Sequence, residues 1–386
     1  QKANEAFRRW RNRVNNLINC TKQSYFTGKI SSASDQKAIY KVANELLHRK
    51  KSSALPTHTS AEELANKFGK FFSDKILNIR KKLDLDSDMS PPTGITCAEH
   101  STQNGGVRTK LLSFDPATEE EVLKLINESA TKSCSLDPVP TWLVKECKGE
   151  LLPIVTHIVN LSLATSTMPE SLKEALVTPL LKKVLLNSEI FKNYRPVSNL
   201  AYISKLIEKI VCRRFQNHME SNCLNEVMQS AYKQFHSTET ALIRVKNDIL
   251  DALDTHGAAI LVLLDLSAAF DTIDHKILLN RLKDMGVDGA ALAWFVSYLS
   301  GRSQAVLING ARSEKLVLDF GVPQGSVLGP HLFVTYTRPL GDIVRKHGLQ
   351  FHIYADDTQL YLAFNPKIPG SLRSEERRVG KECRSR

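Results

Sequence analysis

The run "AAILVLLDLSAAFD", residues 258–271, constrains the fold more than any other stretch. Residues 259–264 are apolar at both odd and even positions, which is the pattern of a strand covered on both faces. Asp265 follows where that strand should end. A carboxylate cannot continue a covered strand without a partner, so the run predicts a buried strand with an acid at its C-terminal end.

A second acidic position occurs in "IYADDTQLY", residues 353–361, where Asp356 and Asp357 separate two strand-like segments. The pattern predicts a tight hairpin with both acids at the turn. If this hairpin pairs with the strand before Asp265, three carboxylates meet, and such hard oxygen ligands suit Mg²⁺ or Mn²⁺. Taken alone, the pair is more typical of a polar turn, and Asp265 of a capping residue.

Helical periodicity and turn residues divide the rest of the chain into helices and strands. Asn309-Gly310 predicts a hairpin, and the glycines and prolines of 321–330 predict a loop with close backbone approach. Pro179 is expected to break a short strand, and Thr272 to cap a helix that stops at Gly286. Expected helices cover about 36–51, 60–83, 117–128, 141–166, 204–219 and 238–253, with another through 332–340.

Charge and composition limit the class of protein. The 386 residues carry a net charge of +11, and residues 1–51 hold 12 Lys and Arg against 3 acids. This basic arm, with Trp10 among its arginines, could bind phosphates or form a solvated helix face. No apolar run reaches a membrane span, and the seven scattered cysteines favour reduced thiols over structural zinc. The start without Met or a signal core suggests a piece of a longer protein.

Three blocks in order, "LVLLDLSAAFD", "GVPQGSVLGP" and "YADD", resemble motifs A, B and C of the reverse transcriptases of LINE-type retrotransposons, which lack long terminal repeats. The resemblance extends upstream through "NYRPVSNLAYISKLIEKIV" and covers roughly 133–366. It implies an α+β right-hand polymerase with an antiparallel palm sheet packed on helices and without its thumb. The expected parts are a basic helical N-terminal region (1–83), a linker (84–108) and a reverse transcriptase domain (109–366), with fingers about 133–235, palm about 236–366, and a tail (367–386).

The resemblance implies an RNA-directed DNA polymerase that joins dNTPs to a DNA primer on an RNA template. Asp265, Asp356 and Asp357 would be catalytic and would hold two Mg²⁺ ions, with Mn²⁺ as the alternative metal. Phe270 would exclude a 2′-OH, and Gln324 would contact the sugar of the incoming nucleotide. The full set of implied nucleotide-binding residues is Lys182, Lys183, Arg195, Leu266, Ser267, Ala268, Ala269, Phe270, Gln324 and Gly325. Lys233, Gln234, Phe235 and His236 could touch the template. No membrane partner is expected, and the oligomeric state stays open.

Several alternatives remain beside this interpretation. Phe270 on its own is typical of a core aromatic, Pro323-Gln324-Gly325 of a simple turn, and lone basic residues of solvated surface. An RNA-dependent RNA polymerase usually carries Gly where Ala355 stands, and a fragment without a thumb could bind nucleic acid without catalysis. Residues 373–386 resemble a translated sequencing adapter, so we expect the natural coding sequence to stop near Leu372.

Overall fold

The computed structural model describes residues 2–33, 36–47, 55–87, 109–132, 134–183, 185–266 and 268–367. Most of the expected linker, Ser267 and nearly all of the tail lie outside these ranges. The chain divides into two compact units, 1–56 and 57–386. The region expected at 1–83 is therefore divided, and its last helix, α3 (Ala61–Ser87), belongs to the larger unit.

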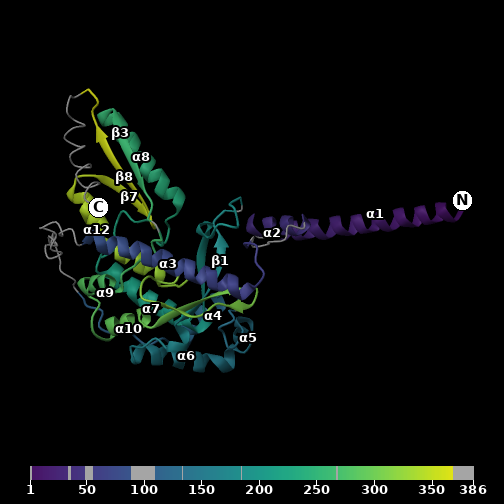
Figure 1. The fold of residues 1–386 in the computed structure, drawn as a ribbon, viewed down its shortest axis with the longest axis horizontal. Helices are drawn as coiled ribbons and strands as arrows, with labels where there is room; N and C mark the ends of the chain where they lie inside the picture. Colours follow the sequence, from purple (N-terminus) through teal and green to yellow (C-terminus); the bar gives the residue numbers. More distant parts are fainter. Residues whose placement is uncertain are drawn as a thin grey trace. The chain divides into compact units, whose positions relative to one another are not determined.

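The smaller unit consists of two helices, α1 (Lys2–Ser31) and α2 (Gln36–Leu46) (Figure 1). The Lys29 ammonium and the Glu45 carboxylate join them at 3.0 Å. Phe7 and Trp10, which belong to the apolar stripe of the basic arm, are each 65% exposed. The stripe is thus a surface feature of this unit as described.

The larger unit contains two sheets. The first has the order β2-β1-β4-β5, with β6 also paired to β4, and the second has the order β3-β8-β7. The strands of the first sheet are β1 (Glu174–Leu181), β2 (Tyr194–Leu200), β4 (Arg302–Ile308), β5 (Ala311–Arg312) and β6 (Leu316–Leu318). Those of the second are β3 (Ala258–Leu264), β7 (Gln350–Tyr354) and β8 (Asp357–Phe364). The fold is therefore mixed, with helices and sheets.

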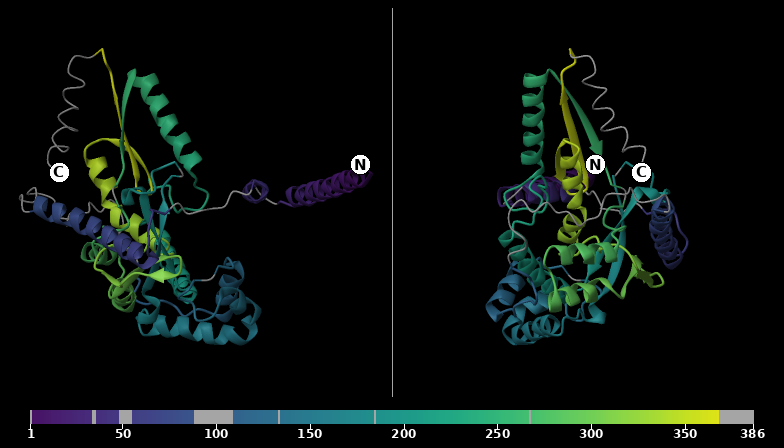
Figure 2. Two further views of the ribbon diagram at one scale, coloured as in Figure 1. Left: turned by 45° about the vertical axis from the view of Figure 1, so that its right-hand side comes forward. Right: turned by 90° about the vertical axis from the view of Figure 1, so that its left-hand side faces the viewer.

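Helices pack against both sheets. Helix α3 packs on β4 and β5, whereas α8 (Thr238–His256) packs on β3, β7 and β8 (Figures 1 and 2). The remaining helices are α4 (Glu119–Glu128), α5 (Thr141–Glu146), α6 (Lys148–Ala164), α7 (Tyr202–Ser221), α9 (His275–Asp284), α10 (Gly289–Leu299), α11 (Gly329–Thr337) and α12 (Pro339–Lys346), with short 3₁₀ turns at Glu170–Leu172 and Phe191–Asn193. Among the described residues, no helix is both long and apolar enough to cross a membrane.

The main core lies among these helices. Trp294, Phe295 and Tyr298 of α10 are fully buried, and the Trp294 indole donates a hydrogen bond to Ser162 Oγ at 3.0 Å. Helix α7 contributes its predicted apolar side to the same cluster, including Leu206 and Ile210. This buried helical core supports the loops and strand ends described below.

Three local expectations were wrong. Strand β1 runs through Pro179, because Pro179 faces Pro196 of β2 and neither residue has an N–H that the ladder must use. Helix α9 is capped by Asp274, whose Oδ1 accepts hydrogen bonds from the backbone N–H groups of Lys276 and Ile277, rather than by Thr272.

The third concerns the opening strand, β3. It forms as predicted, but residues 260–264 are exposed. Among the described residues β3 is an edge strand that pairs only with β8, and α8 covers one face of the sheet.

Candidate active site

The three predicted aspartates lie at one end of the β3-β8-β7 sheet. Strands β3 and β8 are antiparallel, and their last pair is Leu264 with Thr358, so one further step in the same register sets Asp265 opposite Asp357. Strands β7 and β8 close a hairpin in which Tyr354 pairs with Asp357. Ala355 has a φ of 57°, which forms the tight turn that holds Asp356 beside Asp357.

The electrostatics of Asp357 report this proximity. Partial burial, followed by the negative charges of Asp356 and then Asp265, raises the pKa of Asp357 above its ordinary value. Within the described ranges, however, no three His, Cys, Asp or Glu side chains are gathered closely enough to form a metal-binding cluster. The strand register and the hairpin turn thus bring the three acids together at the level of the backbone.

A group of basic residues lies near Asp265. The hairpin of β1 and β2 continues to Lys182, whose backbone N–H donates to the Asn193 carbonyl at 2.9 Å, and Arg195 stands on the opposite strand. Burial, followed by the positive charges of Lys75, Arg195 and Lys192, lowers the pKa of Lys182, while Asp265 acts in the opposite direction. Lys182, Lys183 and Arg195 are exposed, so the expected phosphate-binding residues are accessible.

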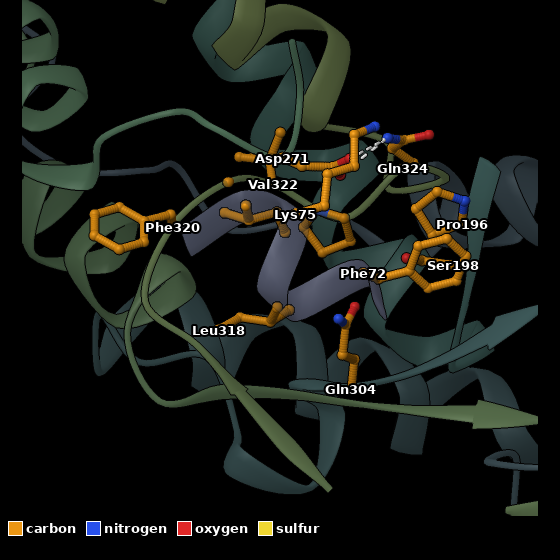
Figure 3. Close-up of a pocket in the computed structure, with 13 residues that line it drawn as sticks. Phe72, Lys75, Pro196, Ser198, Asp271, Gln304, Leu318, Phe320, Val322 and Gln324 are labelled. Carbon is orange, nitrogen blue, oxygen red and sulfur yellow. Dashed lines mark hydrogen bonds between the residues drawn. The ribbon is translucent and has the colours of Figure 1, made fainter. Parts of the chain in front are cut away.

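Gln324 and Gly325 lie in the loop between β6 and α11. The Gln324 Nε2 donates to both carboxylate oxygens of Asp271 at 2.9 Å, and its backbone carbonyl accepts from Ser198 N at 2.8 Å (Figure 3). Gly325 has a φ of +130°, and a Cβ there would collide with the Ser198 carbonyl oxygen. Gly325 is therefore a point of close backbone approach, and the approaching backbone is that of β2.

Phe270 follows the segment 266–269 that was expected to cradle phosphates. Its ring stacks on Phe333 with centroids 4.8 Å apart, and it packs against the main core while staying partly exposed. Leu266 is 40% exposed, and Ala268 has a φ of 55° in the turn that leads to Phe270. Ala269, like Phe270, packs against the core.

The residues suggested as template contacts behave differently from one another. Lys233 Nζ donates to the Glu226 carbonyl at 2.6 Å, so its charge is engaged within the fold. Gln234 and His236 share a local contact, because His236 Nδ1 lies 2.9 Å from the Gln234 carbonyl. Phe235 is 91% exposed, so its ring is accessible.

Three residues near the site escaped the sequence analysis. Lys75 of α3 lines a pocket together with Asp271 and Gln324, and its charge also acts on Lys182 (Figure 3). Lys192 belongs to the same basic group. Asp271 directly follows Phe270 in "LVLLDLSAAFD", and this position could have identified it as a site residue. Lys75 lies far from every motif, so the sequence did not indicate its role.

A mixed α/β fold with an aspartate pair in a hairpin turn, beside a third aspartate at the end of the neighbouring strand, is characteristic of polymerase domains. The chain belongs to the reverse transcriptase (RNA-dependent DNA polymerase) family, whose sequence profile matches residues 181–381. It is 29% identical over 252 residues to the RNA-directed DNA polymerase from mobile element jockey of Drosophila funebris, an alignment that covers 64% of this chain and 27% of the relative.

Further relatives belong to similar elements. The probable RNA-directed DNA polymerase from transposon X-element of Drosophila melanogaster is 28% identical over 63% of this chain and 27% of its own length. The Pol polyprotein from the type-1 retrotransposable element R2 of Popillia japonica is 24% identical over 47% of this chain and 26% of its own length. The chain thus spans about a quarter of the length of the curated relatives that it matches.

Proposed function

We propose that this chain is the fingers and palm of an RNA-directed DNA polymerase from a LINE-type retrotransposon, with the β3-β8-β7 sheet as its palm sheet and the thumb outside this sequence. The observation that carries the proposal is the register of β3 and β8, which sets Asp265 opposite Asp357 and next to Asp356. The family match and the jockey, X-element and R2 relatives support the same activity.

The donor set fits the divalent cations on which reverse transcriptases in general depend. It consists of carboxylate oxygens alone. Burial and then the negative charges of Asp356 and Asp265 raise the pKa of Asp357, and a bound cation would relieve that repulsion. When bound, two Mg²⁺ ions would activate the primer 3′-OH and stabilise the leaving oxygen of an in-line phosphoryl transfer. Asp265, Asp356 and Asp357 would hold them, since the strand register and the hairpin turn set the three residues side by side.

The other proposed roles concern the dNTP and the primer-template. Lys182 and Arg195, with Lys183 nearby, bind the triphosphate, and backbone N–H groups of 266–269 assist them. The Phe270 ring, held by its stacking on Phe333, excludes a 2′-OH. Gln324 contacts the sugar. The RNA template and the DNA primer lie at the end of the β3-β8-β7 sheet that carries the aspartates, so that the primer 3′-OH reaches them.

Primer extension on an RNA template with Mg²⁺ tests the proposal directly. Asp265→Asn and Asp357→Asn should each lower dNTP incorporation by about 10³-fold or more, because removing a metal-binding carboxylate removes most of the electrostatic catalysis. Asp254→Asn, which changes an exposed acid on α8, is the matched control and should keep the wild-type rate.

The same assay distinguishes the alternative of a binding fragment. A chain that retains an RNA–DNA duplex in a mobility-shift assay, but that extends no primer either alone or joined to a thumb, would contradict the polymerase proposal. Extension that appears only when the thumb is present would support it, because the thumb would then supply the grip on the duplex and this chain the chemistry.

A further inference from the structure

Two acids outside the aspartate triad contact the loop that carries Gln324, which comprises residues 323–328. One is Asp271, at the turn before α9, and the other is Glu208, in the middle of α7. Their hydrogen bonds go to residues other than the three aspartates of the proposed metal site. Asp271 binds the side chain of Gln324, and Glu208 binds the backbone of Val327 and Leu328.

Asp271 determines how the Gln324 amide is oriented. An amide has a donor end and an acceptor end, and a carboxylate accepts hydrogen bonds but donates none. Because both Asp271 oxygens lie 2.9 Å from Gln324 Nε2, only the donor end can face Asp271. The acceptor oxygen must then point away, as Figure 3 shows. Asp271 therefore turns the acceptor oxygen of Gln324 away from itself, where it can accept a hydrogen bond from a ligand.

Glu208 fixes the backbone at the other end of the loop. It is fully buried, and its Oε2 accepts hydrogen bonds from Val327 N at 2.8 Å and Leu328 N at 3.1 Å. Tyr298 OH donates to the same oxygen at 3.2 Å, and Ser204 Oγ donates to Oε1 at 3.3 Å. These N–H groups precede α11, so no residue of that helix can accept from them. A buried acceptor on α7 thus satisfies the loop in one conformation.

We propose that Asp271 and Glu208 are positioning residues for Gln324: Asp271 fixes the amide so that its oxygen accepts from a sugar hydroxyl of the incoming nucleotide, and Glu208 fixes the loop from which Gln324 projects. This inference rests on the proposed function for the identity of the ligand. It narrows that function, because an acceptor at this position recognises a dNTP through its single sugar hydroxyl, the 3′-OH, which a dideoxynucleotide lacks.

Hydrogen exchange in the full chain tests the positioning without requiring activity. In the wild type the Val327 and Leu328 amides should be protected. Glu208→Leu removes both acceptor oxygens and should reduce this protection about tenfold or more, the equivalent of one hydrogen bond. Glu208→Gln keeps an oxygen for the two amides and should restore most of it. Glu121→Gln, which alters a paired acid on α4, is the control and should leave the loop unchanged.

Nucleotide kinetics test the orientation of Gln324. Asp271→Asn offers both a donor and an acceptor, so the Gln324 amide can turn either way. The KM for dNTP should rise about tenfold, the equivalent of one hydrogen bond, with kcat changed less, and the preference for dNTP over ddNTP should fall. A purely structural role would lower kcat for both nucleotides equally.

Each result bears on a separate part of the reasoning. Unchanged exchange of 327–328 in Glu208→Leu, or an unchanged dNTP preference in Asp271→Asn, would overturn the positioning roles. If the wild type extends no primer even with a thumb, the proposed function fails. The positioning of the loop is then decided by exchange alone: faster exchange in Glu208→Leu supports it, and wild-type exchange refutes it.

Discussion

Asp271→Asn should change the free energy of unfolding more favourably, relative to the wild type, at neutral pH than at acidic pH. Burial raises the pKa of Asp271 from 3.8 to about 6, against the lowering effects of the Gln324 hydrogen bonds and the Lys75 charge. The folded protein therefore binds this proton more tightly than the unfolded chain does. That contribution to stability is fully present below pH 3.8 and is lost as the pH rises through about 6. The difference between the two pKa values corresponds to about 3 kcal/mol.

Urea unfolding of the wild type and of Asp271→Asn at pH 4 and pH 7 measures this effect. Asparagine does not titrate, so the free energy of unfolding of the variant minus that of the wild type should increase by up to about 3 kcal/mol between the two pH values. Any loss from the altered Gln324 contact is constant with pH and cancels. A difference that stays constant within about 0.5 kcal/mol would refute a strongly desolvated Asp271. Asp254→Asn serves as the surface control.

Three further predictions concern the site. Phe270→Ala should raise ribonucleotide incorporation in an active polymerase that contains this chain, as measured by rNTP against dNTP kinetics; no change would contradict the 2′-OH role. Gly325→Ala should cost more than about 2 kcal/mol in urea unfolding, because its Cβ meets the β2 backbone at a φ of +130°, and a neutral effect would show that the loop can move away. Asp265→Asn should lower the pKa of Asp357, followed by carboxyl ¹³C NMR titration, since one of the three causes that raise it is removed. A pKa that does not move would mean that the two acids do not share a site.

The positions of the acids were predictable because strand ends and hairpin turns leave local marks. Asp265 ends an apolar strand, and the pair Asp356-Asp357 interrupts two others, so pattern alone indicated both places. Strand pairing is not local, which is why the same pattern made β3 a covered strand when it is an exposed edge. Pro179 was misread for a related reason, since its tolerance depends on the partner, Pro196, which no local rule identifies.

The contacts between distant segments were beyond sequence reasoning. Glu208 lies on a helix whose apolar side was predicted correctly, but nothing in that periodicity indicates that its carboxylate meets residues 327–328, about 120 positions later. Lys75 was likewise assigned to a separate N-terminal region. Such contacts follow from tertiary packing, which no sequence motif encodes when the two partners lie in different blocks, as Asp271 and Gln324 do.

The packing of helix α3 determines how far this chain can be truncated from its N-terminus. It precedes the family-matched segment by about 90 residues, yet it packs on β4, its Arg80 pairs with Asp274 at 2.7 Å, and its Asn66 accepts from Glu314 N at 2.9 Å. A fragment trimmed to the matched segment would lack the helix that packs on β4 and β5. It would also expose Phe191 and Tyr194, whose rings contact the buried Phe68, to water. We therefore expect the shortest fragment that folds stably to begin near Thr57, well upstream of residue 181, where the family match begins.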